Sequence, residues 1–80
     1  MDIKAKCDQI AGNAIYYAEL TVKCSEETEQ LKRNGKLAEA KQSVTNMLEA
    51  YSYALALYDA LKILEYSGEK MEKIETLLKS

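Results

Sequence analysis

The fold of this chain is decided by residues 47–64, which read MLEAYSYALALYDALKIL. Fourteen of these 18 residues are apolar, and only Glu49, Ser52, Asp59 and Lys62 are clearly polar. At 100° per residue the apolar side chains surround nearly the whole helix, whereas an ordinary surface helix carries one apolar stripe. A chain of 80 residues has little material to cover such a helix, so we expect another polypeptide to supply part of the cover.

A second long helical pattern precedes this stretch. Apolar or small residues recur at alternating spacings of four and three from residue 3 to residue 31, as in an amphipathic helix. The segment 33–36 reads RNGK, and its Asn-Gly pair is typical of a helix C-cap and a tight connection. The sequence therefore predicts a first helix over about 2–33 and a second over about 36–66, and the short connection requires them to run antiparallel.

The mid-chain turn also predicts which residues face each other. Facing positions should have numbers that add up to roughly 69, so Tyr17 should meet the neighbourhood of Tyr51. We expect Tyr17, Tyr51 and Tyr58 in the core, with their hydroxyls reaching its edge. We expect Tyr53 at an interface, because it shares a helix face with other apolar side chains.

Gly68 is the predicted stop of the second helix, occupying the position just after its C-cap. A short third helix over about 69–79 should follow, with an apolar side formed by Met71, Ile74, Leu77 and Leu78. An uninterrupted helix through Gly68 is the alternative, because glycine inside a helix costs only about 1 kcal/mol relative to alanine.

These patterns predict an all-α protein with a single domain over residues 1–80. Its architecture should be a long antiparallel helical hairpin plus a short C-terminal third helix. The second helix should be the central element, covered by the first helix, by the third and by another chain. Self-association or a partner helix would complete a helical bundle.

Composition argues against catalysis. The chain has no histidine, so the usual general base and the imidazole metal ligand are missing. Clustered carboxylates such as Glu26, Glu27 and Glu29 lack the Glu-x-x-His pairs of helical metal sites, and a solvated face is the simpler interpretation. We therefore expect a protein that is not an enzyme and that holds no cofactor and no metal.

The two cysteines of the chain indicate the cellular compartment in which it works. Cys7 and Cys24 are 17 residues apart in one predicted helix, a separation of roughly 25 Å. A disulfide needs Cα atoms within about 7 Å, so no intrachain bridge is expected. Free thiols and a start with no long apolar run behind it predict a cytoplasmic protein. Three charged residues within 47–64 argue against a membrane span.

The apolar face of the second helix is the predicted interaction surface. Large apolar side chains that the first helix cannot cover are the candidates for it, and their aromatic members suit interfaces. The candidate residues are Leu48, Tyr53, Leu55, Leu57, Leu64 and Tyr66. The expected partner is a second copy, forming a homodimer, or an amphipathic helix of another protein. The sequence thus favours a non-catalytic interaction module, such as a small adaptor, co-chaperone or regulatory subunit.

A dimeric RNA-binding regulator of the Rop type is the alternative function. Its contacts would be the basic residues around the turn, which are Lys32, Arg33, Lys36 and Lys41. However, the chain carries a net charge of −2, and no aromatic residue is interleaved with this group. A solvated hairpin tip is therefore the simpler interpretation of these residues, and we do not expect nucleic acid as a partner.

Overall fold

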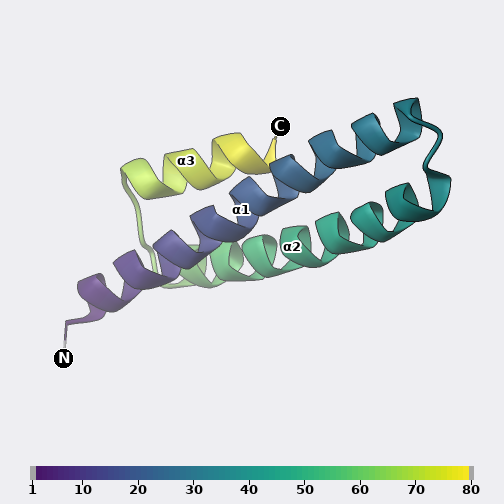
Figure 1. The fold of residues 1–80 in the computed structure, drawn as a ribbon. Helices are drawn as coiled ribbons and strands as arrows, with labels where there is room; N and C mark the ends of the chain where they lie inside the picture. The colour runs from purple at the N-terminus through teal and green to yellow at the C-terminus, as the bar shows by residue number, and fades with distance from the viewer. Residues whose placement is uncertain (1, 80) are drawn as a thin grey trace.

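The computed structural model describes residues 2–79, which form three α-helices and no strand (Figure 1). Helix α1 spans Ile3–Arg33, α2 spans Leu37–Ile63 and α3 spans Glu69–Leu78. Helices α1 and α2 form the long antiparallel hairpin, and α3 folds back beside it over the half that lies away from the turn. The predicted fold class is confirmed. The ends of the predicted domain, residues 1 and 80, lie outside the described residues.

Gly35 lets the chain reverse at the tip of the hairpin. Its φ of +72° lies in the left-handed region that glycine adopts without steric cost. The Gly35 amide donates to the Lys32 carbonyl at 3.1 Å, and the Lys36 amide donates to the Leu31 carbonyl at 2.9 Å. This pair of hydrogen bonds is the Schellman motif, which satisfies carbonyls that the end of α1 would leave unpaired. The predicted end of the first helix is confirmed.

Helix α2 ends earlier than predicted, and a residue other than glycine ends it. Its last residue is Ile63, and Glu65 takes the left-handed conformation with φ +58°. The Glu65 amide donates to the Lys62 carbonyl at 3.0 Å, and the Tyr66 amide donates to the Leu61 carbonyl at 3.0 Å. The second Schellman motif of the chain therefore places a side chain where glycine is favoured.

The predicted role of Gly68 as the end of α2 is wrong. Gly68, with φ +129°, lies directly before α3 and lets the chain enter the new helix direction. The physical reason is a tertiary contact of Tyr66, whose hydroxyl donates a hydrogen bond to an Asp8 carboxylate oxygen on α1. The helix must stop before Tyr66 for its ring to turn back onto the core.

Small side chains fill the contact between α1 and α2. On α1, Ala11, Ala14 and Ala18 are completely buried, and on α2 the buried residues include Ala50 and Ala54. Side chains of this size allow two helix axes to approach closely. Nearer the tip the contact becomes polar, because Ser43 donates to the Cys24 carbonyl at 3.1 Å and accepts from Thr28 at 2.8 Å.

Helix α1, rather than α2, is the central element, so that expectation is wrong. Met71 and Ile74 of α3 are buried in one cluster with Cys7 and Ala11 of α1, and α3 makes most of its contacts with α1. Figure 1 accordingly shows α1 between α3 and α2. Because α3 covers α1 more than α2, much of the apolar surface of α2 stays exposed in residues 2–79.

The strained cap of α2 predicts a stabilising substitution. Glu65→Gly should raise the free energy of unfolding by about 1 kcal/mol, because glycine removes the clash of a β-carbon in the left-handed conformation. The melting temperature should rise by roughly 4–8 °C in a domain of this size. Thermal and denaturant unfolding measure the effect. Glu65→Ala is the control, and an equal gain there would attribute the change to charge instead of backbone strain.

The alanine contact predicts sensitivity to added volume. Ala14→Leu should lower the free energy of unfolding by about 1–3 kcal/mol, because the close-packed helices have no space for three more carbons. Ala5→Leu is the matched control, since Ala5 lies exposed on the same helix and its replacement should change stability by less than about 0.5 kcal/mol. Urea unfolding measures the free energy of unfolding of both variants, and equal values would contradict close packing at Ala14.

Candidate functional site

Exposed apolar side chains concentrate on α2. Among the described residues, large hydrophobic side chains that stay exposed include two outside this helix, Ile3 and Tyr16. The others lie on α2 or directly after it, and they are Leu37, Leu48, Tyr51, Tyr53, Leu55, Ile63 and Leu64. The single chain therefore leaves much of the apolar surface of residues 47–64 uncovered. Surface of this kind marks interaction sites in soluble proteins.

The six candidate residues divide into exposed and packed members. The exposed fraction is 55% for Leu48, 59% for Tyr53, 36% for Leu55 and 52% for Leu64. The other two, Leu57 and Tyr66, are half-buried and pack against the core cluster. Four of the candidates are thus available to another molecule, whereas Leu57 and Tyr66 also hold the chain's own core together.

The exposed candidates lie on two different faces of α2. Tyr53 and Leu64 are close to three whole turns apart, and Leu48 and Leu55 are close to two whole turns apart. Tyr53 lies about 140° around the helix from Leu48, so the two pairs do not share a face. The helical spacing already indicates this separation, although the predicted interaction surface combined all six residues.

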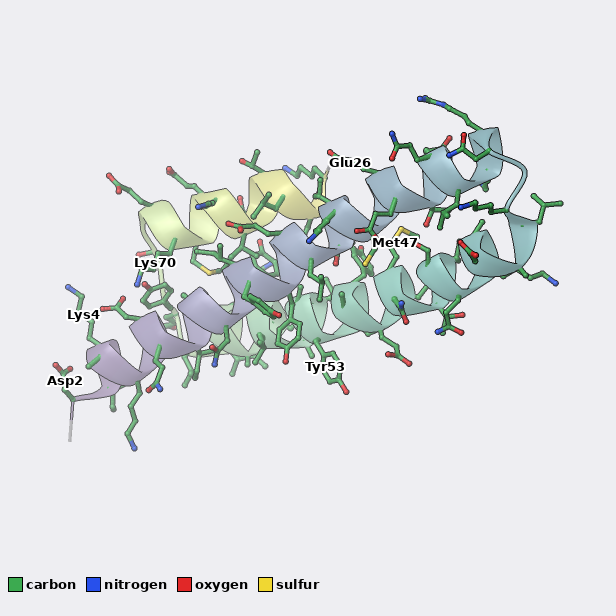
Figure 2. All side chains as sticks on the ribbon, in the orientation of Figure 1. Asp2, Lys4, Glu26, Met47, Tyr53 and Lys70 are labelled. Atoms are coloured by element: carbon green, nitrogen blue, oxygen red, sulfur yellow. The ribbon has the colours of Figure 1, made fainter. Side chains whose placement is uncertain are left out.

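The first surface, which we call the tyrosine face, runs along both long helices on the side opposite α3. Its residues are Ile3, Ile10, Tyr16, Tyr17, Leu20, Tyr53, Leu57 and Leu64. Ile3 and Leu64 line one shallow hollow, and Tyr17, Leu20 and Tyr53 line another. Ile10 and Leu57 connect the two, since both pack against the same core cluster. Figure 2 shows Tyr53 projecting from α2 away from α3.

Three aromatic rings form the middle of the tyrosine face. The rings of Tyr17 and Tyr53 have centroids 5.2 Å apart at an interplanar angle of 35°. Tyr16 meets Tyr17 edge-on at 5.3 Å and 78°. Both contacts lie in the range favoured by aromatic pairs. The predicted interaction surface does not include Tyr16, Ile3 or Leu20, because their place beside Tyr53 and Leu64 depends on how α1 is turned against α2.

The predicted core position of Tyr51 is wrong. The ring that meets Tyr17 is Tyr53, and Tyr51 is 37% exposed. Tyr51 points to the flank occupied by α3, where it lines a hollow with Leu77 and Leu78 at the end of that helix. Because α3 stops there, nothing in residues 2–79 covers the Tyr51 ring fully. Tyr17 and Tyr58 are half-buried, at the edge of the core.

The second surface, which we call the outer face, is the side of α2 that points away from α1. Its residues are Leu48, Ser52, Leu55, Asp59 and Ile63, which recur every three or four positions. The buried residues Ala50, Ala54 and Leu61 lie on the opposite side of the same helix. The predicted interaction surface does not include Ile63, although the side chain of Ile63 is 82% exposed.

Two tyrosine hydroxyls attach α3 and the segment before it to the hairpin. Tyr66 donates to an Asp8 carboxylate oxygen, and Tyr58 donates to Glu75 Oε1 at 2.7 Å. The hydrogen bond to Asp8, with desolvation, raises the pKa of Tyr66 to about 12. The hydrogen bond to Glu75, again with desolvation, raises the pKa of Tyr58. Tyr66 is therefore engaged within the chain.

The basic residues at the tip do not form an unopposed positive patch. All of them are exposed, namely Lys32, Arg33, Lys36 and Lys41. Lys32 Nζ lies 4.0 Å from Glu29 Oε1. Arg33 lines a surface hollow together with Glu26 and Glu29. Carboxylates beside the basic groups weaken the attraction of this region for a phosphate backbone.

The acidic side chains and the cysteines bear on metal binding and on disulfide formation. Within residues 2–79, no cluster of three or more Cys, Asp or Glu side chains is arranged to hold a metal ion. Cys7 and Cys24 are free thiols and both are buried, in agreement with the prediction of no bridge between them. None of the three helices has the length and apolar content needed to cross a membrane.

The tyrosine hydrogen bonds predict a loss of stability at alkaline pH. A phenol whose pKa is higher in the folded state stabilises the fold fully below pH 10, its ordinary value, and this stabilisation is lost as the pH rises toward about 12. Urea unfolding of the wild type and Tyr66→Phe should show a wild-type advantage at pH 8 that shrinks by pH 11.5. A pH-independent difference would contradict the hydrogen bond to Asp8.

Comparison with protein-family models, with curated proteins and with solved structures found no match for this chain.

Proposed function

We propose that the protein is a non-catalytic interaction module, of the kind used as a small adaptor, co-chaperone or regulatory subunit. The tyrosine face binds an amphipathic helix of another polypeptide and so completes a four-helix arrangement. The observation that supports this proposal is the tyrosine face itself. It is an apolar strip across two helices, and its centre is an aromatic cluster whose outer rings, Tyr16 and Tyr53, are 62% and 59% exposed.

Helix α3 shows which kind of helix packs on a flank of this hairpin. It covers the other flank of the hairpin with a buried apolar side that includes Met71 and Ile74. Its opposite side is charged, and Lys73 Nζ lies 3.4 Å from Glu19 Oε1 at the rim of the contact. A helix with the same division of apolar and charged sides fits the tyrosine face. The strip from Ile3 to Leu20 is about 26 Å long, so roughly five helical turns would cover it.

The energetic contribution of this surface comes from apolar burial rather than from charge. None of the eight residues of the tyrosine face is charged, and the charged residues that line its hollows, Lys4, Glu49 and Glu65, are exposed. Burying a large apolar side chain is worth about 1.5–3 kcal/mol, and tyrosine is enriched among residues that dominate binding energies. Binding of the partner helix should therefore depend only weakly on salt, because screening acts on charged groups.

RNA binding through the hairpin tip stays the alternative, but no observation favours it. The candidate contacts Lys32, Arg33, Lys36 and Lys41 are spread over the end of one helix and the start of the next. Carboxylates of Glu26 and Glu29 lie among them. The aromatic rings of the protein gather elsewhere, so none of them stacks beside this group.

A single charged side chain placed in the aromatic cluster tests the proposal. Tyr53→Glu should lower the affinity for a partner at least about tenfold, because the carboxylate must lose its water in an apolar contact. Gln30→Glu is the matched control, since it adds the same charge at an exposed site on α1. Proteins retained from cell extract by immobilised wild type are identified, purified and titrated against both variants by calorimetry.

The proposal requires that the purified partner binds the wild type and Gln30→Glu alike and that Tyr53→Glu binds it poorly. Circular dichroism should show unchanged helix content in both variants, because both positions are exposed. A partner that binds Tyr53→Glu as tightly as the wild type would contradict the role of the tyrosine face.

A further inference from the structure

We propose that α3 is an exchangeable segment of this chain. When the hinge, which we define as residues 64–68, straightens into helix, α3 leaves its own α1 and takes the same place on α1 of a second copy. Two chains that exchange α3 in this way form a domain-swapped dimer. The exchange goes beyond the proposed function, because it concerns the flank of α1 that α3 covers and uses none of the aromatic rings of the tyrosine face.

The structure shows which helix fits this flank of α1, because α3 itself occupies it. Met71 and Ile74 of α3 are buried in the core cluster to which α1 contributes. At the rim of the contact, Lys73 Nζ lies 3.4 Å from Glu19 Oε1. Each of these contacts joins residues that are far apart in the chain. A second copy therefore offers α3 the same partners, which is the condition for exchanging an element between identical chains.

The hinge alone decides whether α3 closes on its own chain. Figure 1 shows the chain reversing at the hinge, so that α3 folds back beside the hairpin. Most contacts of α3 are with α1 and few are with α2, to which the hinge connects it. If residues 64–68 continue the helix of α2, the joined helix runs straight on, beyond the end of the hairpin. A straight hinge therefore removes α3 from its own α1 and presents it to another chain.

The backbone conformation of the hinge favours straightening. Glu65 has φ +58°, in the left-handed region where a β-carbon is strained. Gly68 has φ +129° and ψ −168°, a combination that is open essentially to glycine alone. A helical hinge returns both residues to ordinary angles and forms the uninterrupted helix that is the alternative in the sequence. Short hinges under strain of this kind promote domain swapping.

Tyr66 opposes straightening. Its hydroxyl donates a hydrogen bond to an Asp8 carboxylate oxygen on α1, and its ring packs against the core cluster. Because Tyr66 lies within the hinge, a straight hinge carries it away from these contacts. The closed monomer and the exchanged dimer therefore differ by the strain at Glu65 on one side and the contacts of Tyr66 on the other. Mass action then shifts the balance toward the dimer as the protein concentration rises.

The hinge also adjoins apolar side chains that the closed chain leaves uncovered. Ile63, directly before the hinge, and Leu64, its first residue, are both exposed. In an exchanged dimer the two connections run between the same two bodies, so the hinges of both copies lie close together. Burial of these aliphatic side chains would offset part of the entropy that is lost on association.

Gly68→Ala tests the exchange, because it disfavours the closed chain alone. An added β-carbon would meet no atom beyond its chain neighbours within 4 Å, so the cost arises from the backbone conformation. In a helical hinge, alanine is favoured over glycine. The variant should dimerise at least about 100-fold more tightly than the wild type. Light scattering across a range of concentrations should show its mass rising from 9.0 kDa toward twice that value. Gly12→Ala is the matched control at an exposed glycine within α1, where an added methyl group has free space and the mass should match the wild type.

A second substitution in the Gly68→Ala variant tests whether the hinge becomes helical. Glu65→Gly should weaken the dimer of that variant at least about tenfold, because glycine relieves the strain of the closed chain and disfavours the helical hinge. The same light-scattering series measures the change. A dimer whose dissociation constant is unaffected by Glu65→Gly would contradict a straight hinge and overturn the exchange.

Zero-length crosslinking locates α3 in the dimer. A carbodiimide joins Lys73 to Glu19 through an amide, since the two charged groups lie 3.4 Å apart. Isotope-labelled and unlabelled Gly68→Ala chains are mixed in urea and refolded together, and the dimer fraction is crosslinked. Mass spectrometry should find that about half of the Lys73–Glu19 links join a labelled to an unlabelled chain. The pair of Lys32 and Glu29 is the internal control, because both residues lie on α1 and their links should always join residues of one chain.

The wild type, refolded in the same way at millimolar concentration, should also give mixed-label links between Lys73 and Glu19. A wild type without such links overturns the proposal, and so does a Gly68→Ala variant that stays monomeric at every concentration. A dimer whose Lys73–Glu19 links never join two labels also overturns it, because α3 would then remain on its own chain. None of these results affects the proposed function, since binding of a partner helix to the tyrosine face is tested separately through Tyr53→Glu.

Discussion

The close approach of α1 and α2 along a line of small side chains is the constraint on which the rest of the structure depends. Ala11, Ala14 and Ala18 on one helix and Ala50 and Ala54 on the other are all buried. Because alanine occupies little volume, no space remains between the helices for larger side chains. Most leucines and tyrosines of residues 47–64 therefore lie at the flanks of the contact, whereas Leu61 is fully buried beside Ala11 and Ala14.

The chain covers one of these flanks itself, and only in part. Helix α3 has 10 residues, which give it a length of about 15 Å, beside a molecule that extends 51 Å. It buries Met71 and Ile74, and the Tyr58 and Tyr66 hydroxyls attach it and its connection to the hairpin. A cover this short leaves the opposite flank and the outer side of α2 open, as expected for a small domain with a limited core.

The two open surfaces differ in the physical basis of recognition. The tyrosine face is uncharged and crosses two helices, so it suits tight binding of an apolar partner surface. The outer face lies on one helix and includes the Asp59 carboxylate among its aliphatic residues, so a molecule that covers this face must also pair or solvate a charge.

The sequence by itself determined the helices, the antiparallel hairpin and the excess of apolar residues in 47–64, because these follow from local periodicity and from the Asn-Gly turn. It also contained the separation of Leu48 from Tyr53, since helical spacing alone places them on different faces. The tertiary structure decided what depends on packing between distant residues. Tyr66 reaches Asp8 across 58 positions, and this contact ends α2 at Ile63, ahead of the glycine that marks the stop in the sequence. The rotation of α1 against α2 set Tyr53 beside Tyr17 and left Tyr51 exposed, because a turn of a helix by one or two residues moves a side chain from one flank to the other.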